Sequence, residues 1–263
     1  MSAEKRLTTE AITRGLSTGL IGRRVLVYPR LGSTNEEAKR LAEAGEPEGT
    51  LVVADEQTAG RGRLQRTWWA PPGTALLMSL IFRPDLAPPQ AQRLTMLCSL
   101  AVCDAIAGMT RLAPAVKWPN DVLLGERKVC GILTELGIEG TRLAYAVVGM
   151  GINVNVDFSE AGGLAYTATS LAQELGYEVS RLELLRAILG GIEERYARLR
   201  AGESPHAEWA ARLVTLGQRV VVTTPGGQLS GVAEGVDADG ALLLRDESGA
   251  LRRILAGDVT LRT

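Results

Sequence analysis

The last fifty residues of the chain constrain its fold most strongly. The sequence there breaks into five short apolar segments separated by glycine-containing turns, at residues 219–223, 229–236, 241–245, 251–255 and 258–261. Short segments joined in this way are typical of antiparallel strands. They predict a small β-barrel that forms a C-terminal domain of residues 215–263, after a larger domain of residues 1–214.

The larger domain mixes strand and helix patterns. Strands are expected at residues 24–28, 51–54, 75–82, 122–124, 129–136 and 143–148. Helices are expected at residues 7–20, 33–44, 90–108, 169–175 and 181–200. Ser33 and Ser180 each stand three residues before a glutamate, a spacing typical of a helix N-cap. The helix at 90–108 is apolar all round, which predicts that it is a core helix.

Composition limits the classes of function. A chain of 263 residues with 46% hydrophobic content can bury one large core and a small second one. Its formal net charge of −1 argues against broad electrostatic binding to DNA or to an anionic membrane. The N-terminus is polar, and no apolar run reaches the ~20 residues needed to span a bilayer. We therefore expect a cytoplasmic protein with neither DNA nor a membrane as its partner.

The rare residue types narrow the chemistry. The three cysteines, Cys98, Cys103 and Cys130, lie in apolar runs and lack CxxC spacing, which argues against a disulfide framework or a zinc site and for a reducing compartment. The only histidine, His206, lies in a polar stretch, which excludes His-based triads and His-rich metal sites. Chemistry must therefore depend on lysine, arginine and aspartate.

Glycine and arginine alternate at residues 60–63, Gly-Arg-Gly-Arg. Glycine lets the backbone approach an anion closely, and the planar guanidinium groups match carboxylate or phosphate oxygens two at a time. The same short pattern also occurs in solvated basic loops. The later segments Lys117-Trp118-Pro119-Asn120-Asp121 and Lys128-Val129-Cys130-Gly131 supply further cations. Together they indicate an enzyme that activates a carboxylic acid with ATP.

In these and other segments the chain resembles the biotin–protein ligase family, or biotin–[acetyl-CoA-carboxylase] ligases, over nearly its whole length. The matching segments are residues 33–35, 57–63, 68, 117–121, 128–133, 149–155 and 168–171. The resemblance implies an α/β (α+β) fold, with a mixed-sheet catalytic domain of the biotin/lipoate ligase type and a C-terminal SH3-like barrel. It also implies the single-function type that lacks an N-terminal DNA-binding domain.

The resemblance implies a two-step reaction. ATP first converts the biotin carboxylate to biotinyl-5'-AMP, and biotin then passes to one lysine of a biotin carboxyl carrier protein, such as an acetyl-CoA carboxylase subunit. The expected ligands are ATP, biotin and Mg²⁺, with the metal bound through the ATP phosphates and its protein ligands unknown. Whether the chain is a monomer or a homodimer is left open.

The family also implies roles for individual residues. Biotin contacts are expected from Ser33, Thr34, Asn35, Gln57, Gly60, Arg61, Gly62, Arg63, Lys128, Gly131, Gly149 and Gly151. ATP contacts are expected from Arg61, Trp68, Lys117, Asn120 and Asn153. Catalytic roles fall to Lys128, Lys117, Arg63 and Asp121, with Asp121 orienting or deprotonating the incoming lysine. Other roles are the alternatives: helix capping for Ser33 and Thr34, a core aromatic for Trp68 and a turn residue for Asn153. Asp121 could instead cap a turn or help to hold a metal.

The chain departs from the family at Leu64-Gln65, where many relatives have a glycine two residues after Arg63. This departure bears on how tightly the loop closes over the adenylate. Two other functions compete with the biotin ligase. A lipoate or octanoate ligase has a related fold, but lipoate would leave the polar groups expected to face biotin unpaired. A non-catalytic biotin or nucleotide sensor is disfavoured by Lys117 and Lys128, since cations aimed at a reacting phosphate serve the transition state.

Overall fold

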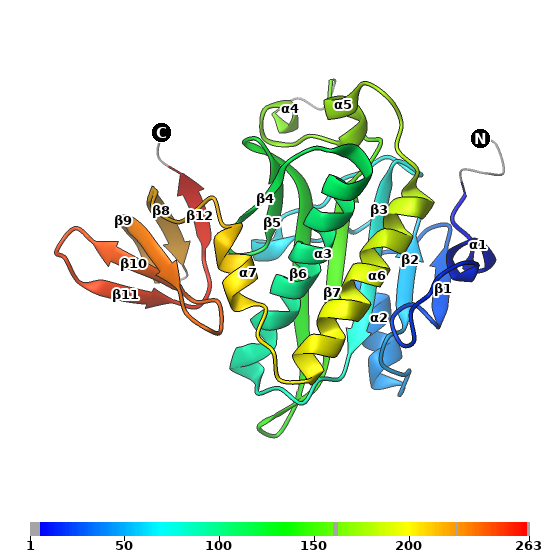
Figure 1. The fold of residues 1–263 in the computed structure, drawn as a ribbon, viewed down its shortest axis with the longest axis horizontal. Helices are drawn as coiled ribbons and strands as arrows, with labels where there is room; N and C mark the ends of the chain where they lie inside the picture. The colour runs from blue at the N-terminus through cyan, green and yellow to red at the C-terminus, as the bar shows by residue number, and fades with distance from the viewer. Residues whose placement is uncertain (1–5, 160–162, 225, 262–263) are drawn as a thin grey trace.

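The protein is described from a computed structural model, which covers residues 6–159, 163–224 and 226–261. Figure 1 shows a large sheet with helices on it and a second, smaller sheet to one side. The large sheet has the strand order β1-β2-β3-β7-β6-β5-β4. Its strands are β1 (Val25–Tyr28), β2 (Leu51–Ala54), β3 (Ala75–Phe82), β4 (Pro114–Lys117), β5 (Asp121–Leu124), β6 (Arg127–Glu139) and β7 (Arg142–Asn153). β1 and β2 are parallel and the other neighbours are antiparallel, so the expected mixed sheet is confirmed.

Helices cover both faces of this sheet. Helices α3 (Gln92–Thr110) and α6 (Arg181–Arg200) pack together on one face, while α2 (Thr34–Glu43) packs on β2, β3 and β7 from the other. Side chains alternate along a strand, so β3 serves both layers: Met78 and Leu80 join the main core, and Ile81 joins the cluster under α2. The side chains that point toward α2 are separate from the main core. A binding site can therefore form on this face where those residues are small or polar.

The most apolar helix lies inside the protein. By length and composition the stretch Pro88–Thr110, formed by a 3₁₀ turn η3 (Pro88–Ala91) and α3, is long and apolar enough to cross a membrane, and 67% of its most apolar window is buried in the protein. Two charged residues, Arg93 and Asp104, interrupt this stretch, so it contains no uninterrupted apolar run of ~20 residues. Helix α3 is buried by its packing against the sheet and the neighbouring α6, which confirms the prediction of a core helix.

Two expectations near the N-terminus were wrong. The helix predicted at 7–20 is only five residues long, α1 (Thr9–Thr13). Beyond it, the backbone N–H groups of Gly19, Leu20 and Ile21 all donate to the carboxylate of Glu193 on α6, which fixes a non-helical path. Ser33 does stand at the N-cap position of α2, but its side chain makes no capping hydrogen bond.

The remaining helices are short. They are α4 (Leu164–Thr167), α5 (Leu171–Leu175), α7 (His206–Ala211) and the 3₁₀ turn η2 (Arg63–Gln65). The Ser180 hydroxyl accepts a hydrogen bond from the backbone N–H of Glu183 at 3.3 Å, so the predicted N-cap of α6 is confirmed. The helix predicted at 169–175 begins two residues late, because Ser170 caps α5.

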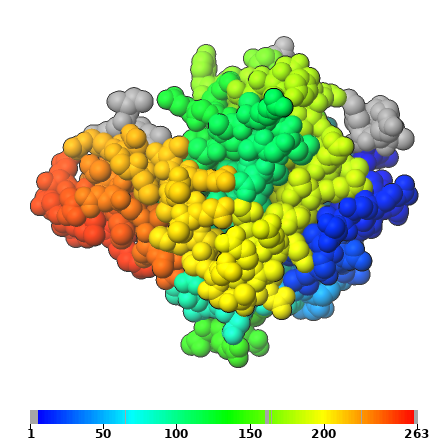
Figure 2. All heavy atoms as spheres, viewed as in Figure 1, coloured from blue at the N-terminus to red at the C-terminus, as the bar shows by residue number. Residues whose placement is uncertain are grey.

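The C-terminal strands pair in one antiparallel sheet of order β11-β10-β9-β8-β12. They are β8 (Arg219–Thr224), β9 (Gly227–Val236), β10 (Leu242–Asp246), β11 (Leu251–Ile254) and β12 (Asp258–Leu261), which confirms all five predicted segments. Pro225, in the first expected turn, lies outside the described residues. In Figure 2 this sheet and the N-terminal segment form opposite sides of the molecule.

Candidate active site

Three glycines make a bare floor on the α2 face of the sheet. Gly131 of β6 pairs in register with Gly151 of β7, and Gly149 lies two residues earlier on β7. A Cβ atom at Gly151 would lie 2.5 Å from the Trp68 ring, and one at Gly149 would lie 2.0 Å from Asn35 Oδ1. Real Cβ atoms do not approach so closely, so glycine is what lets Trp68 and Asn35 lie directly on the sheet.

The Gly-Arg segment folds into a tight loop that leads to Trp68. The Trp68 backbone N–H donates to Gly60 O at 2.9 Å, and the Gly62 N–H donates to Arg66 O at 2.7 Å. A Cβ at Gly60 would be 2.6 Å from Trp68 O, so the loop closes only because Gly60 has no side chain. Leu64 has φ +54°, a left-handed conformation that costs a branched residue free energy. The departure from the family pattern thus coincides with local backbone strain.

A lysine, an aspartate and an arginine meet beside the floor. Lys128 Nζ lies 2.6 Å from Asp121 Oδ1 and 5.4 Å from the centroid of the Trp68 ring. The Arg63 guanidinium donates to Asn120 Oδ1 at 3.2 Å. Burial lowers the pKa of Arg63, and the nearby Asp121 carboxylate opposes that shift. The structure therefore brings together the three residue types that the sequence assigned to catalysis.

The other cations near the loop and the Lys117–Asp121 segment differ in their partners. Lys117 on β4 pairs directly opposite Asp121 on β5, so both side chains project from the same face of that strand pair. Among the described residues, Lys117 has no ion pair. Arg61 forms an ion pair with Glu36 of α2, and Arg66 forms one with Asp258 of β12 in the small sheet. In this arrangement Arg61 is turned toward α2.

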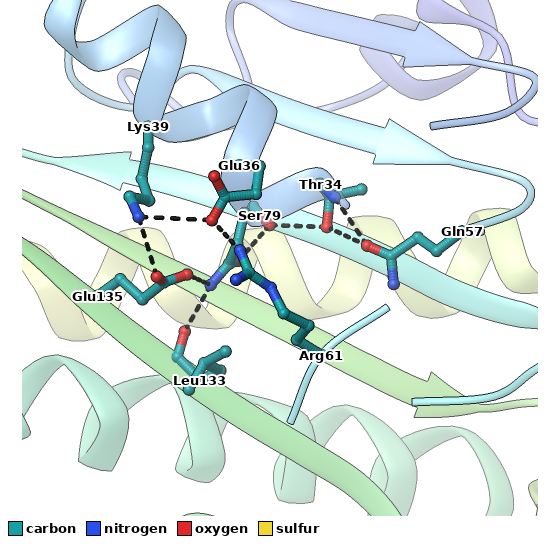
Figure 3. A network of polar contacts seen from close by, with 9 residues as sticks. Thr34, Glu36, Lys39, Gln57, Arg61, Ser79, Leu133 and Glu135 are labelled. Carbon is teal, nitrogen blue, oxygen red and sulfur yellow. Dashed lines mark hydrogen bonds and ion pairs between the residues drawn. The ribbon is translucent and has the colours of Figure 1, made fainter. Parts of the chain in front are cut away.

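A polar network lines the other end of the floor (Figure 3). Gln57 Oε1 accepts hydrogen bonds from the Thr34 backbone N–H at 2.7 Å and from the Thr34 hydroxyl at 3.0 Å. The Thr34 hydroxyl lies 2.8 Å from that of Ser79, which is 2.6 Å from Asn35 Oδ1. Asn35 is buried with both ends of its amide engaged, and Ser33 is buried beside it.

Sequence reasoning missed three members of this network, Ser79, Glu135 and Lys39. Glu135 Oε2 accepts from Asn35 Nδ2 at 2.8 Å, and Lys39 Nζ lies 3.1 Å from the other carboxylate oxygen. Ser79 is the one polar residue in the fully buried strand Ala75–Phe82, and that isolation was the available signal. Glu135 stands two residues after Leu133 on the site face of β6, where alternation would have indicated it.

Two buried polar atoms at the site lack partners within the described residues, Trp68 Nε1 and Asn153 Oδ1. The Asn153 amide nitrogen is fixed, since it donates to Thr169 O at 3.0 Å and to Lys128 O at 3.4 Å. A buried acceptor without a partner costs free energy unless a ligand satisfies it. Asn153 is therefore suited to meet a ligand donor.

The Lys117–Asp121 segment is braced from the small sheet. The Trp118 indole N–H donates to Gly240 O at 2.8 Å, and the Trp118 backbone N–H donates to the Thr215 hydroxyl at 3.0 Å. The Trp118–Pro119 peptide bond is cis. Trp118 is thus a fully buried structural residue that holds the turn between Lys117 and Asp121. In residues 6–159, 163–224 and 226–261, no group of three or more His, Cys, Asp or Glu side chains could hold a metal ion.

Comparison with known proteins gives matches along the chain. The model of the "Biotin/lipoate A/B protein ligase family" matches residues 27–153, and the "Biotin protein ligase C terminal domain" matches residues 215–262. "Bifunctional ligase/repressor BirA" of Bacillus subtilis is 37% identical over 261 residues, 97% of this chain and 79% of that protein. "Biotin--[acetyl-CoA-carboxylase] ligase" of Mycobacterium tuberculosis is 35% identical over 272 residues, 98% of each chain.

A solved structure agrees. The biotin protein ligase from Aquifex aeolicus in complex with biotin and ATP superposes with a TM-score of 0.76 at 30% identity, covering 91% of this chain and 99% of that one. Because the matches extend over nearly the whole length and include both sheets, the chain belongs to the biotin protein ligase family.

Proposed function

We propose that this chain attaches biotin to a lysine of a biotin carboxyl carrier protein, using ATP and passing through biotinyl-5'-AMP. The relative from Mycobacterium tuberculosis is named as such a ligase, and the Aquifex neighbour holds biotin and ATP. The observation that carries the proposal is the glycine floor with cations at one end and the Thr34–Gln57 pair at the other. An acid with a polar ring fits this order of groups.

The cations suit the adenylation step. Adenylation brings a carboxylate and a phosphate together, so fixed positive charge at the reacting atoms should lower the barrier most. We assign Arg63 and Lys128 to the biotin carboxylate and the bridging phosphate, and Lys117 to the α-phosphate. Arg63 is partly buried, and a charge acts more strongly there than in open solvent. Arg61 would leave Glu36 to cover the adenylate.

The nucleotide end is assigned to Trp68, Asn120 and Asn153. The Trp68 ring packs against Gly131 and Gly151, and its remaining aromatic surface could contact an adenine ring. The unpaired Asn153 Oδ1 would accept from the adenine amino group, a donor that biotin does not carry at that end. Mg²⁺ would neutralise phosphate charge, and since Asp121 Oδ1 is engaged by Lys128, the metal is best held by the ATP phosphates themselves.

Asp121 is assigned to the second step. The carrier lysine must be neutral when it attacks the adenylate, and a carboxylate within reach can orient it or take its proton. Because Asp121 lies 2.6 Å from Lys128, which we assign to the biotin carboxylate, it would stand beside the carbonyl that is attacked.

The domain division and the compartment are part of the proposal. The matched ranges 27–153 and 215–262 support a boundary near residue 215 between a catalytic domain and an SH3-like domain. The three cysteines are free and buried, which supports a reducing, cytoplasmic setting.

Exchange of labelled pyrophosphate into ATP tests the proposal without a carrier protein. With Mg²⁺ present, exchange is expected with biotin and absent with lipoate or with no acid. Exchange with lipoate instead would move the chain to the lipoate branch of the family. No exchange with either acid would favour a sensor that binds without reacting.

A further inference from the structure

We propose that Glu135, held by Lys39, is a positioning residue that fixes the direction of the hydrogen bonds in the polar network of Figure 3. Fixed in this way, Thr34 presents an acceptor to the ligand, beside a donor of Gln57 that the Thr34 backbone N–H orients. The site would then select an N–H group next to a C=O group, the edge of a cyclic urea. This inference rests on the proposed function and deepens it.

Two hydrogen bonds in the network, Asn35 with Glu135 and Thr34 with Gln57, can have only one donor each. A carboxylate can only accept, so the Asn35 atom that faces Glu135 must be the amide nitrogen, which also donates to the backbone carbonyl of Leu133 at 3.2 Å. A backbone N–H can only donate, so the Gln57 atom that faces Thr34 must be the amide oxygen. Both amides are therefore oriented by groups outside the ligand pocket.

The hydroxyls between these points follow from them. Asn35 Oδ1 is turned toward Ser79 and can only accept, so the single Ser79 proton goes to Asn35 at 2.6 Å. Ser79 then has only lone pairs left for Thr34, 2.8 Å away. The Thr34 proton stays within the network, on Ser79 or on Gln57 Oε1. The Thr34 oxygen receives no proton from its neighbours and is left as an acceptor.

The opposite polarity appears next to it. Gln57 Nε2 points away from Thr34, and within the described residues it has no hydrogen-bond partner. It therefore offers two donors beside the Thr34 acceptor. A ligand edge that matches carries a donor and an acceptor in the order N–H, C=O. A dithiolane ring offers neither group.

Lys39 determines how the side-chain amide of a Glu135→Gln variant is oriented. Lys39 Nζ is 3.1 Å from Glu135 Oε1 and can only donate. In Glu135→Gln the new amide must turn its oxygen to Lys39 and its nitrogen to Asn35. Asn35 then either flips, and faces Leu133 O with its own oxygen, or loses its partner. Both outcomes disturb the direction of the bonds at Ser79 and Thr34.

The test measures biotin binding by calorimetry and biotin kinetics by pyrophosphate exchange. Glu135→Gln should weaken biotin binding on the order of tenfold, with KM raised and kcat nearly unchanged, because Glu135 is remote from the reacting carboxylate. Adding Lys39→Met should restore most of the affinity, since the amide can then turn its oxygen back to Asn35. A purely structural role would make the double variant worse.

A matched control is Glu43→Gln, a carboxylate of α2 that accepts from the Tyr145 hydroxyl at 3.0 Å and does not contact the network. It should leave affinity unchanged. If the wild type binds biotin and Glu135→Gln binds it equally well, the positioning role is overturned and the ligase proposal stands. If the second substitution fails to restore affinity, the positioning role is also overturned. If the wild type does not bind biotin, both proposals fall.

Discussion

Removing the Lys128 amine should lower the rate of adenylation while leaving the free energy of unfolding nearly unchanged. Lys128 Nζ contacts Asp121 and faces the Trp68 ring, beside which the reacting groups would lie. Loss of one fixed group that stabilises developing charge costs about 2.7–4 kcal/mol of transition-state stabilisation, or ~10²–10³ in rate. Lys128→Ala should therefore lower single-turnover formation of biotinyl-AMP by ~10²–10³.

Its effect on folding should be small. The side chains of Lys128 and Asp121 are 32% and 22% exposed, and an ion pair so open to water contributes only about 0–1 kcal/mol. Urea unfolding should accordingly give a free energy of unfolding within about 1 kcal/mol of the wild type. The same substitution thus separates two quantities that a general loss of structure would change together.

The preceding residue supplies a matched control. Arg127 forms an ion pair with Glu174 at the same distance, 2.6 Å, with side chains 37% and 22% exposed. Arg127→Ala should cost as little stability as Lys128→Ala and leave adenylation unchanged. Equal losses of rate in the two variants, or a loss below about threefold in Lys128→Ala, would refute the assignment of Lys128 to the reacting phosphate.

Three further predictions concern the frame of the site and its cysteines. Trp118→Phe leaves a buried carbonyl without its donor and should cost about 1–3 kcal/mol more in urea unfolding than Trp209→Phe, because the buried indole N–H of Trp209 has no partner among the described residues; equal costs would contradict this. Gly151→Ala puts a methyl group 2.5 Å from the Trp68 ring and should raise the KM for ATP in pyrophosphate exchange at least tenfold, and an unchanged KM would argue against stacking on this ring. Burial raises the pKa of the Cys103 thiol to about 12, so the neutral thiol stabilises the folded state fully below the unfolded pKa of about 8.5. As pH rises above that value, the free energy of unfolding should fall by up to about 1.4 kcal/mol per pH unit. Cys103→Ala should make this fall less steep, and an unchanged slope would disprove it.

Local patterns were sufficient to predict most elements. β3 is an apolar run, interrupted only by Ser79, that follows a Pro-Gly turn, and glycines mark the turns of the small sheet, so neither needed tertiary information. The glycines of the site were also visible, because their motifs are local. The helix predicted at 7–20 failed for the opposite reason: the Glu193 carboxylate that captures its second half lies more than 170 positions away.

The interactions that orient the site residues could not be predicted in the same way. Asn35 was expected to touch biotin, yet its orientation depends on Glu135 of β6, 100 positions later, and on Ser79 of β3. Nothing in either segment alone indicates that β3, β6 and α2 meet at this point. Pairing of distant polar side chains is decided by the register of the sheet, which periodicity does not specify.

The small sheet supports the site although it supplies none of the assigned residues. It holds the segment between Lys117 and Asp121 through the Trp118 indole and Gly240, and it holds the loop that carries Arg63 through the ion pair of Arg66 with Asp258. A shift of about 1 Å in a catalytic group can cost on the order of 100-fold in rate. Substitutions in the turn at residue 240 or in β12 should therefore lower the adenylation rate by shifting Lys117 or Arg63. No contact between the small sheet and the substrate is needed for this effect.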